Sequence, residues 1–469
     1  MPVDLDDLFA TLGRHADTIP LATAGSARQR GRQRTRTRAL VAAAAAVCLV
    51  AAGTGAALHR QEHEAAPVLA PVGSPIEFGG QARSSSAVGA DGRLYTAWQT
   101  LDGRIRMTAA ELSTGARAWP VREIGRRTDT LRNVSAVAPG VVVVLGHANG
   151  VSPDSTLYFF DPADGRQRWS VPIDARDDLV PHTSGLVLMS AATGRTESLD
   201  WATGAKRWEL PPPADRPVRT LGTYRDENWA LVLGRPITFT DDRLVQVTAA
   251  GKVQVRDIAT GALRHTVVSV PPDKDPRTFL AYGDRLYNDE HECCDNRGYR
   301  IRMTDLSSAR GGSTVVRTGS AGHEVEMLQA CGDQRVCVSD QDRGGEATVT
   351  VLDRATGRQV WQVPAPDGAY AATVPGYTLI AGPEGDRVIY DRDGRRVWTT
   401  SAASVDWLDA DTLLLLPTFQ DGPVSKVSMP DGKVTVLGDA PPASDACVTT
   451  PERLACPVIT SLRIWRLTG

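Results

Sequence analysis

The chain has 469 residues, of which 43 are glycine, 30 are proline and ten are tryptophan, and its formal net charge is −3. Glycine and proline at this density, spread along most of the chain, exclude a fold of long helices and favour many short strands joined by turns. The length alone is compatible with one large core or two smaller ones, so the number of domains has to come from the sequence pattern.

The first 38 residues differ from the rest in charge. This leader contains seven arginines and four aspartates, so its net charge is +3 and that of the remaining residues is −6. Within residues 4–13, apolar side chains recur at helical spacing after Asp4, which predicts a short amphipathic helix. It would either dock a cytosolic partner or rest on a membrane surface. The arginines before residue 39 indicate membrane topology and anionic lipid rather than nucleic acid.

Residues 39–58 contain no charged side chain and are long enough to cross a bilayer once as a helix. Arginines precede this run, whereas mixed charges follow it, so the positive-inside rule places residues 1–38 in the cytoplasm and the later residues outside. A cleaved signal peptide is the alternative interpretation. Cys48 does not fit a lipoprotein signal, because Val47 occupies a position that requires a very small residue and the apolar run continues past it.

After a linker rich in Pro and Ala at residues 59–75, one motif recurs: an acidic residue, two others, Thr or Asp, Gly, three others, and Trp. A variant copy keeps Gly261 but has His265 in place of Trp, and a last copy at Gly432 lacks the Trp. The glycines recur every 37–57 residues, and a degenerate turn at 305–308 fills the one gap of 96 residues. The copies with tryptophan contain Gly115 and Trp119, Gly165 and Trp169, Gly204 and Trp208, Gly357 and Trp361, and Gly394 and Trp398.

The motif has a structural explanation. An Asp side chain accepts hydrogen bonds from the backbone two residues later, and Gly adopts the positive φ that closes a tight hairpin. Strand-like segments precede each turn, such as 141–145 and 243–247, so each unit is expected to form three or four antiparallel strands. A single such sheet leaves apolar faces exposed, and a closed ring of sheets covers them. Residues 76–469 are therefore predicted to be an all-β propeller.

These copies, above all Asp200–Gly204 with Trp208 and Asp353–Gly357 with Trp361, resemble the pyrroloquinoline-quinone-like β-propeller repeats. The family includes quinoprotein dehydrogenases and the propellers of outer-membrane-assembly lipoproteins. The resemblance covers about residues 75–469 and implies seven or eight blades. Nine candidate units can be counted, so we expect about eight four-stranded blades, within a range of seven to nine, with one unit as an irregular insertion. The last strands are expected to pair with a strand near 75–78.

Six of the seven cysteines follow the predicted membrane span, as an oxidising compartment permits. Cys331 and Cys337 flank one turn, and Cys447 and Cys456 flank another, so two structural disulfides are predicted. Cys293 and Cys294 are adjacent, which leaves a vicinal disulfide or two free thiols as alternatives.

The resemblance also raises the question of a cofactor. The family's dehydrogenases hold quinone beneath a vicinal disulfide with calcium bound nearby, but Cys293 and Cys294 fall in the fifth unit, whereas the enzymes' pair lies early in the propeller. The calcium ligands and catalytic acid have no counterparts that we can assign in this chain. The polar segment 289–295 contains metal-ligand types without a second matching group elsewhere. His147, His182, His265 and His323 are scattered. No catalytic, cofactor-binding or metal site is predicted.

The sequence therefore predicts a single-pass cell-membrane protein whose extracytoplasmic propeller binds or scaffolds an envelope protein, peptide or polymer. No nucleic-acid partner is expected. A quinone-dependent dehydrogenase is one alternative. A transmembrane sensor, in which the propeller reads an external ligand and residues 1–38 signal to a cytosolic partner, is another.

Overall fold

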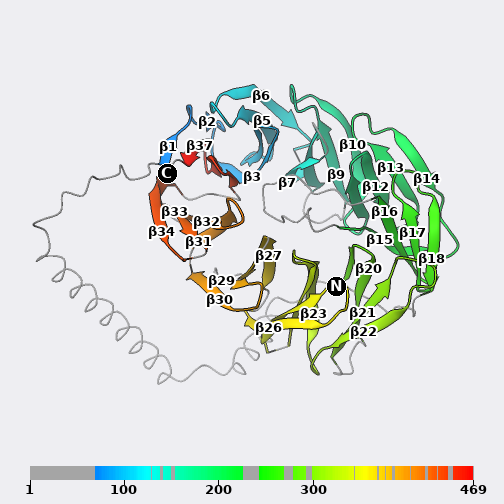
Figure 1. The fold of residues 1–469 in the computed structure, drawn as a ribbon. Coiled ribbons are helices and arrows are strands. Elements are labelled where there is room, and N and C mark those ends of the chain that lie inside the picture. The colour runs from blue at the N-terminus through cyan, green and yellow to red at the C-terminus, as the bar shows by residue number, and fades with distance from the viewer. Residues whose placement is uncertain are drawn as a thin grey trace, which may run out of the picture. The chain divides into compact units, whose positions relative to one another are not determined.

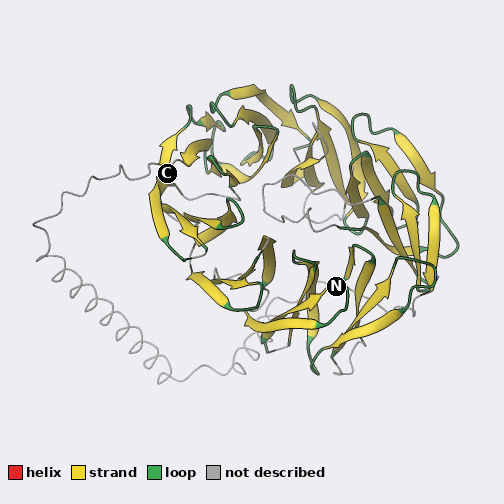
Figure 2. Cartoon of the chain, in the orientation of Figure 1, coloured by secondary structure: helices red, strands yellow, loops and turns green. Residues whose placement is uncertain are grey.

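The computed structural model describes the chain from residue 69 to residue 467 with gaps. In the described ranges every regular element is a β-strand (Figure 2). These ranges contain no helix that is long and apolar enough to cross a membrane. The predicted helix at 4–13 and the predicted span at 39–58 lie outside these ranges. The ranges are 69–127, 129–137, 141–148, 154–224, 242–268, 278–291, 298–342, 344–366, 369–374, 376–382, 386–401, 403–417, 421–429, 431–441 and 447–467.

The described strands form nine antiparallel sheets, which we number as blades 1 to 9 (Figure 1). In blades 1 to 8, four strands that follow one another along the chain also lie side by side in the sheet. Blade 1 consists of β3 (Ala82–Ala90), β4 (Arg93–Thr100), β5 (Ile105–Glu111) and β6 (Arg117–Ile124). Blade 2 consists of β7 (Asp129–Val137), β8 (Val141–Ala148), β9 (Asp154–Phe160) and β10 (Gln167–Asp174). Blade 3 consists of β11 (Asp178–His182), β12 (Gly185–Met189), β13 (Thr196–Asp200) and β14 (Lys206–Leu210).

The next five blades repeat this order. Blade 4 consists of β15 (Pro217–Gly222), β16 (Arg243–Thr248), β17 (Lys252–Asp257) and β18 (Leu263–Val268). Blade 5 consists of β19 (Phe279–Tyr282), β20 (Arg285–His291), β21 (Tyr299–Asp305) and β22 (Ser313–Thr318). Blade 6 consists of β23 (Glu324–Ala330), β24 (Arg335–Gln341), β25 (Ala347–Asp353) and β26 (Gln359–Ala365). Blade 7 consists of β27 (Tyr370–Val374), β28 (Tyr377–Ala381), β29 (Asp386–Asp391) and β30 (Arg396–Ser401). Blade 8 consists of β31 (Ala403–Trp407), β32 (Thr412–Pro417), β33 (Gly422–Ser428) and β34 (Val434–Ala440).

Blade 9 closes the ring by combining strands from both ends of the described chain. It contains β35 (Val448–Thr450), β36 (Arg453–Val458) and β37 (Ser461–Leu467), and β1 (Leu69–Pro71) and β2 (Ile76–Glu77) both pair with β37. The pairing of β2 agrees with the closure expected near residues 75–78. β1 adds a further strand within the range 59–75, for which the sequence suggested a linker. The guanidinium Nε of Arg453 also donates to the Leu112 carbonyl of blade 1 over 3.1 Å.

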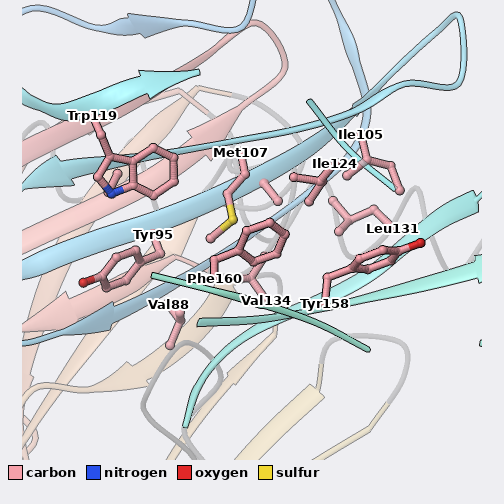
Figure 3. Close-up of a cluster of buried hydrophobic side chains, with 12 residues drawn as sticks. Val88, Tyr95, Ile105, Met107, Trp119, Ile124, Leu131, Val134, Tyr158 and Phe160 are labelled. Carbon is pink, nitrogen blue, oxygen red and sulfur yellow. The ribbon is translucent and has the colours of Figure 1, made fainter. Parts of the chain in front are cut away.

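Nine clusters of buried apolar side chains hold the sheets together, and each cluster lies between two consecutive blades. Between blades 1 and 2, Tyr95, Met107 and Trp119 pack against Tyr158 and Phe160 (Figure 3). Successive side chains of a strand point to opposite faces, so a central strand contributes to two of these clusters. In β4, for example, Tyr95 joins the cluster shared with blade 2, whereas Leu94 and Trp98 join the cluster shared with blade 9.

The number of blades follows from the apolar clusters, because each of the nine lies between two neighbouring blades of the ring. Eight blades were favoured from the sequence, but the described residues form nine sheets, at the upper end of the predicted range. The unit with the degenerate turn at 305–308 is a regular four-stranded sheet, β19–β22, and none of the sheets formed by the described residues is an irregular insertion. Its Leu306 is buried against blade 4, so the unit covers its neighbour as the others do.

Candidate binding site at one rim of the propeller

The two ends of the ring differ in composition. Along the chain, the innermost strand of a blade follows the outermost strand of the preceding blade. All innermost strands therefore begin at the same end of the ring, which we call the rim. The motif turns join the third and fourth strands of the blades and lie at the opposite end, the turn end. The recurring motif residues therefore lie away from the rim.

At the turn end the motif forms the hydrogen-bonded hairpin that its residues predicted. In blade 3 the Oδ1 atom of Asp200 accepts from the backbone N–H groups of Ala202 and Thr203 over 3.0 Å each, and from the Thr203 hydroxyl over 2.9 Å. This hydroxyl is the main reason why the pKa of Asp200 lies below its ordinary value. Gly204 has a φ of 68° and donates its N–H to the Asp200 carbonyl over 2.9 Å.

Four of the five motif tryptophans are fixed by the turn of the following blade. The Nε1 atom of Trp169 donates to the carbonyl of Trp201 over 2.9 Å, one residue after the acidic residue of that turn. A Cβ atom on Gly204 would lie 2.6 Å from the Trp169 ring, so the glycine also provides the surface on which the indole lies. The same arrangement joins Trp119 to Pro162 and Gly165, Trp208 to Ile258 and Gly261, and Trp361 to Arg392 and Gly394.

Four motif positions depart from this contact between a tryptophan and the glycine of the next turn. His265 replaces Trp in blade 4, and its Nε2 lies 2.9 Å from the Leu306 carbonyl, the equivalent acceptor. Gly357 faces Val316, and Gly115 faces the backbone of Val72. Trp398 precedes a turn whose Gly432 has no neighbour near its Cβ position. In this geometry most of the predicted motif residues connect neighbouring blades.

Both predicted disulfides are present. Cys331 is bonded to Cys337 and Cys447 to Cys456, with Cα–Cα distances of 5.7 and 4.3 Å. Cys293 and Cys294 lie outside the described residues.

A buried polar cluster near the rim joins blades 5 and 6. The Asp340 carboxylate, only 2 % exposed, accepts from the Tyr299 hydroxyl, from Nη2 of Arg317 over 3.3 Å and from the Thr348 hydroxyl over 2.6 Å. The Nδ1 atom of His323 lies 3.3 Å from the same carboxylate. Burial raises the pKa of Tyr299, so the phenol stays protonated and remains a donor. The sequence did not single out this cluster, because its members come from four strands and a loop.

His182, another of the scattered histidines, is also buried. Its ring nitrogens lie 3.1 Å from the Ser184 hydroxyl and 3.3 Å from the Ser198 hydroxyl. Burial, and then the charge of Arg207, lowers its pKa to about 4. A neutral imidazole between two hydroxyls, with no carboxylate among its described hydrogen-bond partners, has the geometry of a structural core histidine.

The rim itself presents exposed side chains on β-bulges. Four innermost strands, β3, β7, β15 and β23, each have a register shift within their first four residues. A bulge places an extra residue outside the ladder and redirects its side chain, a device that is frequent beside functional sites. The extra residues are Arg83, Arg132, Val218 and Glu326, and all four are exposed. Sequence reasoning missed them, because a bulge is not visible in a pattern of alternating residues.

Metal-ligand side chains do not cluster in the described part of the chain. In that part of the chain no three His, Cys, Asp or Glu side chains gather with the geometry of a metal site. The half-buried carboxylate of Asp178 is engaged by protein donors: it accepts from Arg219 over 2.9 Å and from the Thr220 N–H over 2.6 Å. Burial raises the pKa of Asp178 in spite of these donors.

The model of a family described as outer membrane protein assembly factor BamB matches residues 43–305 and 345–438. Comparison with curated proteins gave no significant match. BamB from Moraxella catarrhalis has 15 % sequence identity and a TM-score of 0.43, and the match covers 79 % of this chain and 99 % of that one.

Two other solved structures are similar at a comparable level. The computationally designed Ika8 protein has 16 % identity and a TM-score of 0.44, over 78 % of this chain and 99 % of that one. The Dos1 propeller has 11 % identity and a TM-score of 0.44, over 86 % and 95 %. The family match extends over more than half of the chain, and the chain belongs to the PQQ-like β-propeller family described by the outer membrane protein assembly factor BamB.

Proposed function

We propose that this chain is a membrane-anchored, extracytoplasmic propeller that binds or scaffolds an envelope protein, peptide or polymer through its rim. One observation carries the proposal: the described rim presents exposed Arg, Val and Glu side chains on bulges of separate blades, whereas the motif residues at the turn end are engaged between blades. Membership of the BamB family supports a binding role, because the relative that gives the family its description is an assembly factor.

The anchoring part of the proposal rests on the sequence. Residues 39–58 are uncharged and follow an arginine-rich leader. The two disulfides support an oxidising compartment for the propeller. Protease added outside intact cells should cleave a site introduced into the propeller and spare one introduced into residues 1–38. The reverse pattern, or release of the whole chain into the medium, would contradict an anchored propeller.

Binding through the rim is tested by site-specific photo-crosslinking of the full chain in intact cells. A photoreactive residue at Val218 samples the rim, and one at Val360, an exposed position on the outer strand β26, is the matched control. Defined crosslinked species are expected from position 218 and not from position 360. Equal crosslinking from both positions, or none from the rim, would refute the proposal.

The absence of enzymatic activity is part of the same proposal. The family also contains dehydrogenases, so the alternative is tested by adding quinone and calcium to the full chain and recording its absorption spectrum. A cofactor spectrum with dye-linked alcohol oxidation would overturn the binding-module assignment. The sensor alternative is tested by deleting residues 4–13, which would leave rim crosslinking intact and abolish any cytosolic response.

A further inference from the structure

A group of four arginines lies at the rim where blades 1 and 2 meet. Arg83 and Arg132 are the exposed bulge residues of β3 and β7, and Arg126 and Arg127 are exposed in the connection between β6 and β7. We call these four residues the arginine patch. The inference drawn from it deepens the proposed function by naming the kind of partner, and it rests on that function.

The innermost strands β3 and β7 contact each other beside the patch. The Ser86 hydroxyl lies 3.1 Å from Oδ1 of Asn133 and accepts the N–H of Val134 over 3.1 Å. Arg83 lies three residues before Ser86, and Arg132 directly precedes Asn133. Both strands run in the same direction from the rim. Measured along the strands, the positions of the two arginines therefore differ by one or two residues, about 3–7 Å.

The connection that carries Arg126 and Arg127 is held against blade 1. Asp129 donates its N–H to the Arg126 carbonyl over 2.9 Å, and its Oδ2 accepts the Arg126 N–H over 2.7 Å. Gln99 of β4 donates to the Asp129 carbonyl over 2.8 Å. The backbone of Arg126 is therefore hydrogen-bonded to the start of β7, and Arg126 and Arg127 are both exposed.

The charge of the patch is not balanced by the protein. None of the four guanidinium groups forms an ion pair or side-chain hydrogen bond with another residue that the structure describes. The carboxylates of Asp129 and Asp102, in the same part of the rim, have partners of their own. Asp129 is buried and also accepts the Tyr158 hydroxyl over 2.9 Å, and Asp102 pairs with Arg104. Four like charges at one surface attract an anionic partner.

The side chains around the patch decide between a polypeptide and an anionic polymer. Leu101, 71 % exposed, lies in the β4–β5 turn, whose Gly103 abuts the Arg127 carbonyl. Leu179 and Val218, the second residues of β11 and β15, add exposed apolar side chains on the next two blades of the rim. A phosphate polymer such as poly(glycerol phosphate) has no apolar side chains to cover them, whereas protein interfaces combine arginine with apolar contacts.

We propose that the rim of blades 1 to 4 binds an acidic segment of a protein. Its carboxylates pair with the arginine patch, and its apolar side chains cover Leu101, Leu179 and Val218. Carboxylates form bidentate hydrogen bonds with guanidinium groups, which gives the binding orientation as well as charge attraction. The rest of the segment would follow the rim from blade 1 towards blade 4.

The experiment uses the full chain in detergent micelles and a fluorescent 12-residue peptide of alternating Asp and Leu. A peptide of alternating Asp and Ser and a poly(glycerol phosphate) chain are the two comparison probes. The test variant is R126E with R127E. The matched control is R117E with R358E, which makes the same charge change at exposed arginines next to motif turns at the turn end. Melting curves verify that each variant is folded.

Charge reversal in the patch should weaken binding of the Asp–Leu peptide by about tenfold or more, because several exposed ion pairs are lost at once. The control should change it less than about twofold, since long-range attraction is screened by salt. Leu101→Ser should weaken binding of the Asp–Leu peptide and leave the Asp–Ser peptide unaffected. Equal binding to both double variants, no binding of the Asp–Leu peptide to the wild type, or tighter binding of poly(glycerol phosphate) than of either peptide would each overturn the inference.

The photo-crosslinking from position 218 separates this inference from the proposed function. Crosslinks that persist unchanged in R126E with R127E would refute the acidic partner and leave rim binding intact. Loss of crosslinks only in this variant would support both. A wild-type protein without crosslinks would refute rim binding itself.

Discussion

The tryptophan contacts between blades make a quantitative prediction. In Trp208→Phe, the aromatic ring is kept but the Nε1 donor to the Ile258 carbonyl, 3.1 Å away, is lost. Replacing indole by phenyl removes on the order of 40 Å² of apolar surface, about 1 kcal/mol at roughly 25 cal/mol per Å². The lost hydrogen bond costs about 1 kcal/mol more, and up to about 3 kcal/mol if the carbonyl stays unsatisfied. The expected total is about 2–4 kcal/mol.

Trp398→Phe is the matched control. Trp398 occupies the same motif position and is also half-buried, but its Nε1 makes no hydrogen bond to a described residue, and the following Gly432 has no neighbour at its Cβ position. This variant should lose only the contribution of the buried apolar surface, about 1 kcal/mol. His265 provides an internal comparison, because its ring nitrogen occupies the donor position next to the Leu306 carbonyl.

The measurement is urea unfolding followed by far-UV circular dichroism, which does not depend on tryptophan fluorescence. Hydrogen exchange at Gly261, whose N–H donates to the Asp257 carbonyl over 2.8 Å, reports on the turn that Trp208 covers. Exchange should be faster in Trp208→Phe and unchanged in Trp398→Phe. If the free energy of unfolding falls by the same amount in both variants, the indole hydrogen bond of Trp208 does not stabilise the propeller, and the reasoning is wrong.

Three further predictions follow from buried groups. Burial lowers the pKa of His182 to about 4, so the unfolded chain binds a proton that the folded chain excludes. The free energy of unfolding should therefore fall by up to about 3 kcal/mol as the pH drops from about 6.5 to about 4, and less in His182→Gln; parallel pH curves would contradict this. Asp340→Asn should cost about 3–5 kcal/mol in urea unfolding, because Arg317 keeps a charge with only 13 % of its side chain exposed; a loss below about 1 kcal/mol would argue against the ion pair. Cys331→Ser with Cys337→Ser should cost about 2 kcal/mol, and reducing agent should then lower stability less than in the wild type.

The sequence determined the repeating part of this protein. The turn residues act locally: Asp200 bonds to backbone two and three residues away, and Gly204 adopts its positive φ within the same hairpin. Spacing along the chain was therefore enough to predict units of three or four antiparallel strands and the two disulfides. It was also enough to predict that an early strand closes the ring, because a propeller needs a partner for its last strands.

Only the tertiary structure decided the blade number and the rim. A blade is defined by the apolar cluster that it shares with each neighbour, and the degenerate unit at 305–308 is recognised as a blade because Leu306 is buried there. The arginine patch joins side chains of two blades, and Arg83 and Arg132 are exposed through register shifts between paired strands. Such shifts depend on the pairing of one strand with another, so a pattern of residues along a single strand does not contain them.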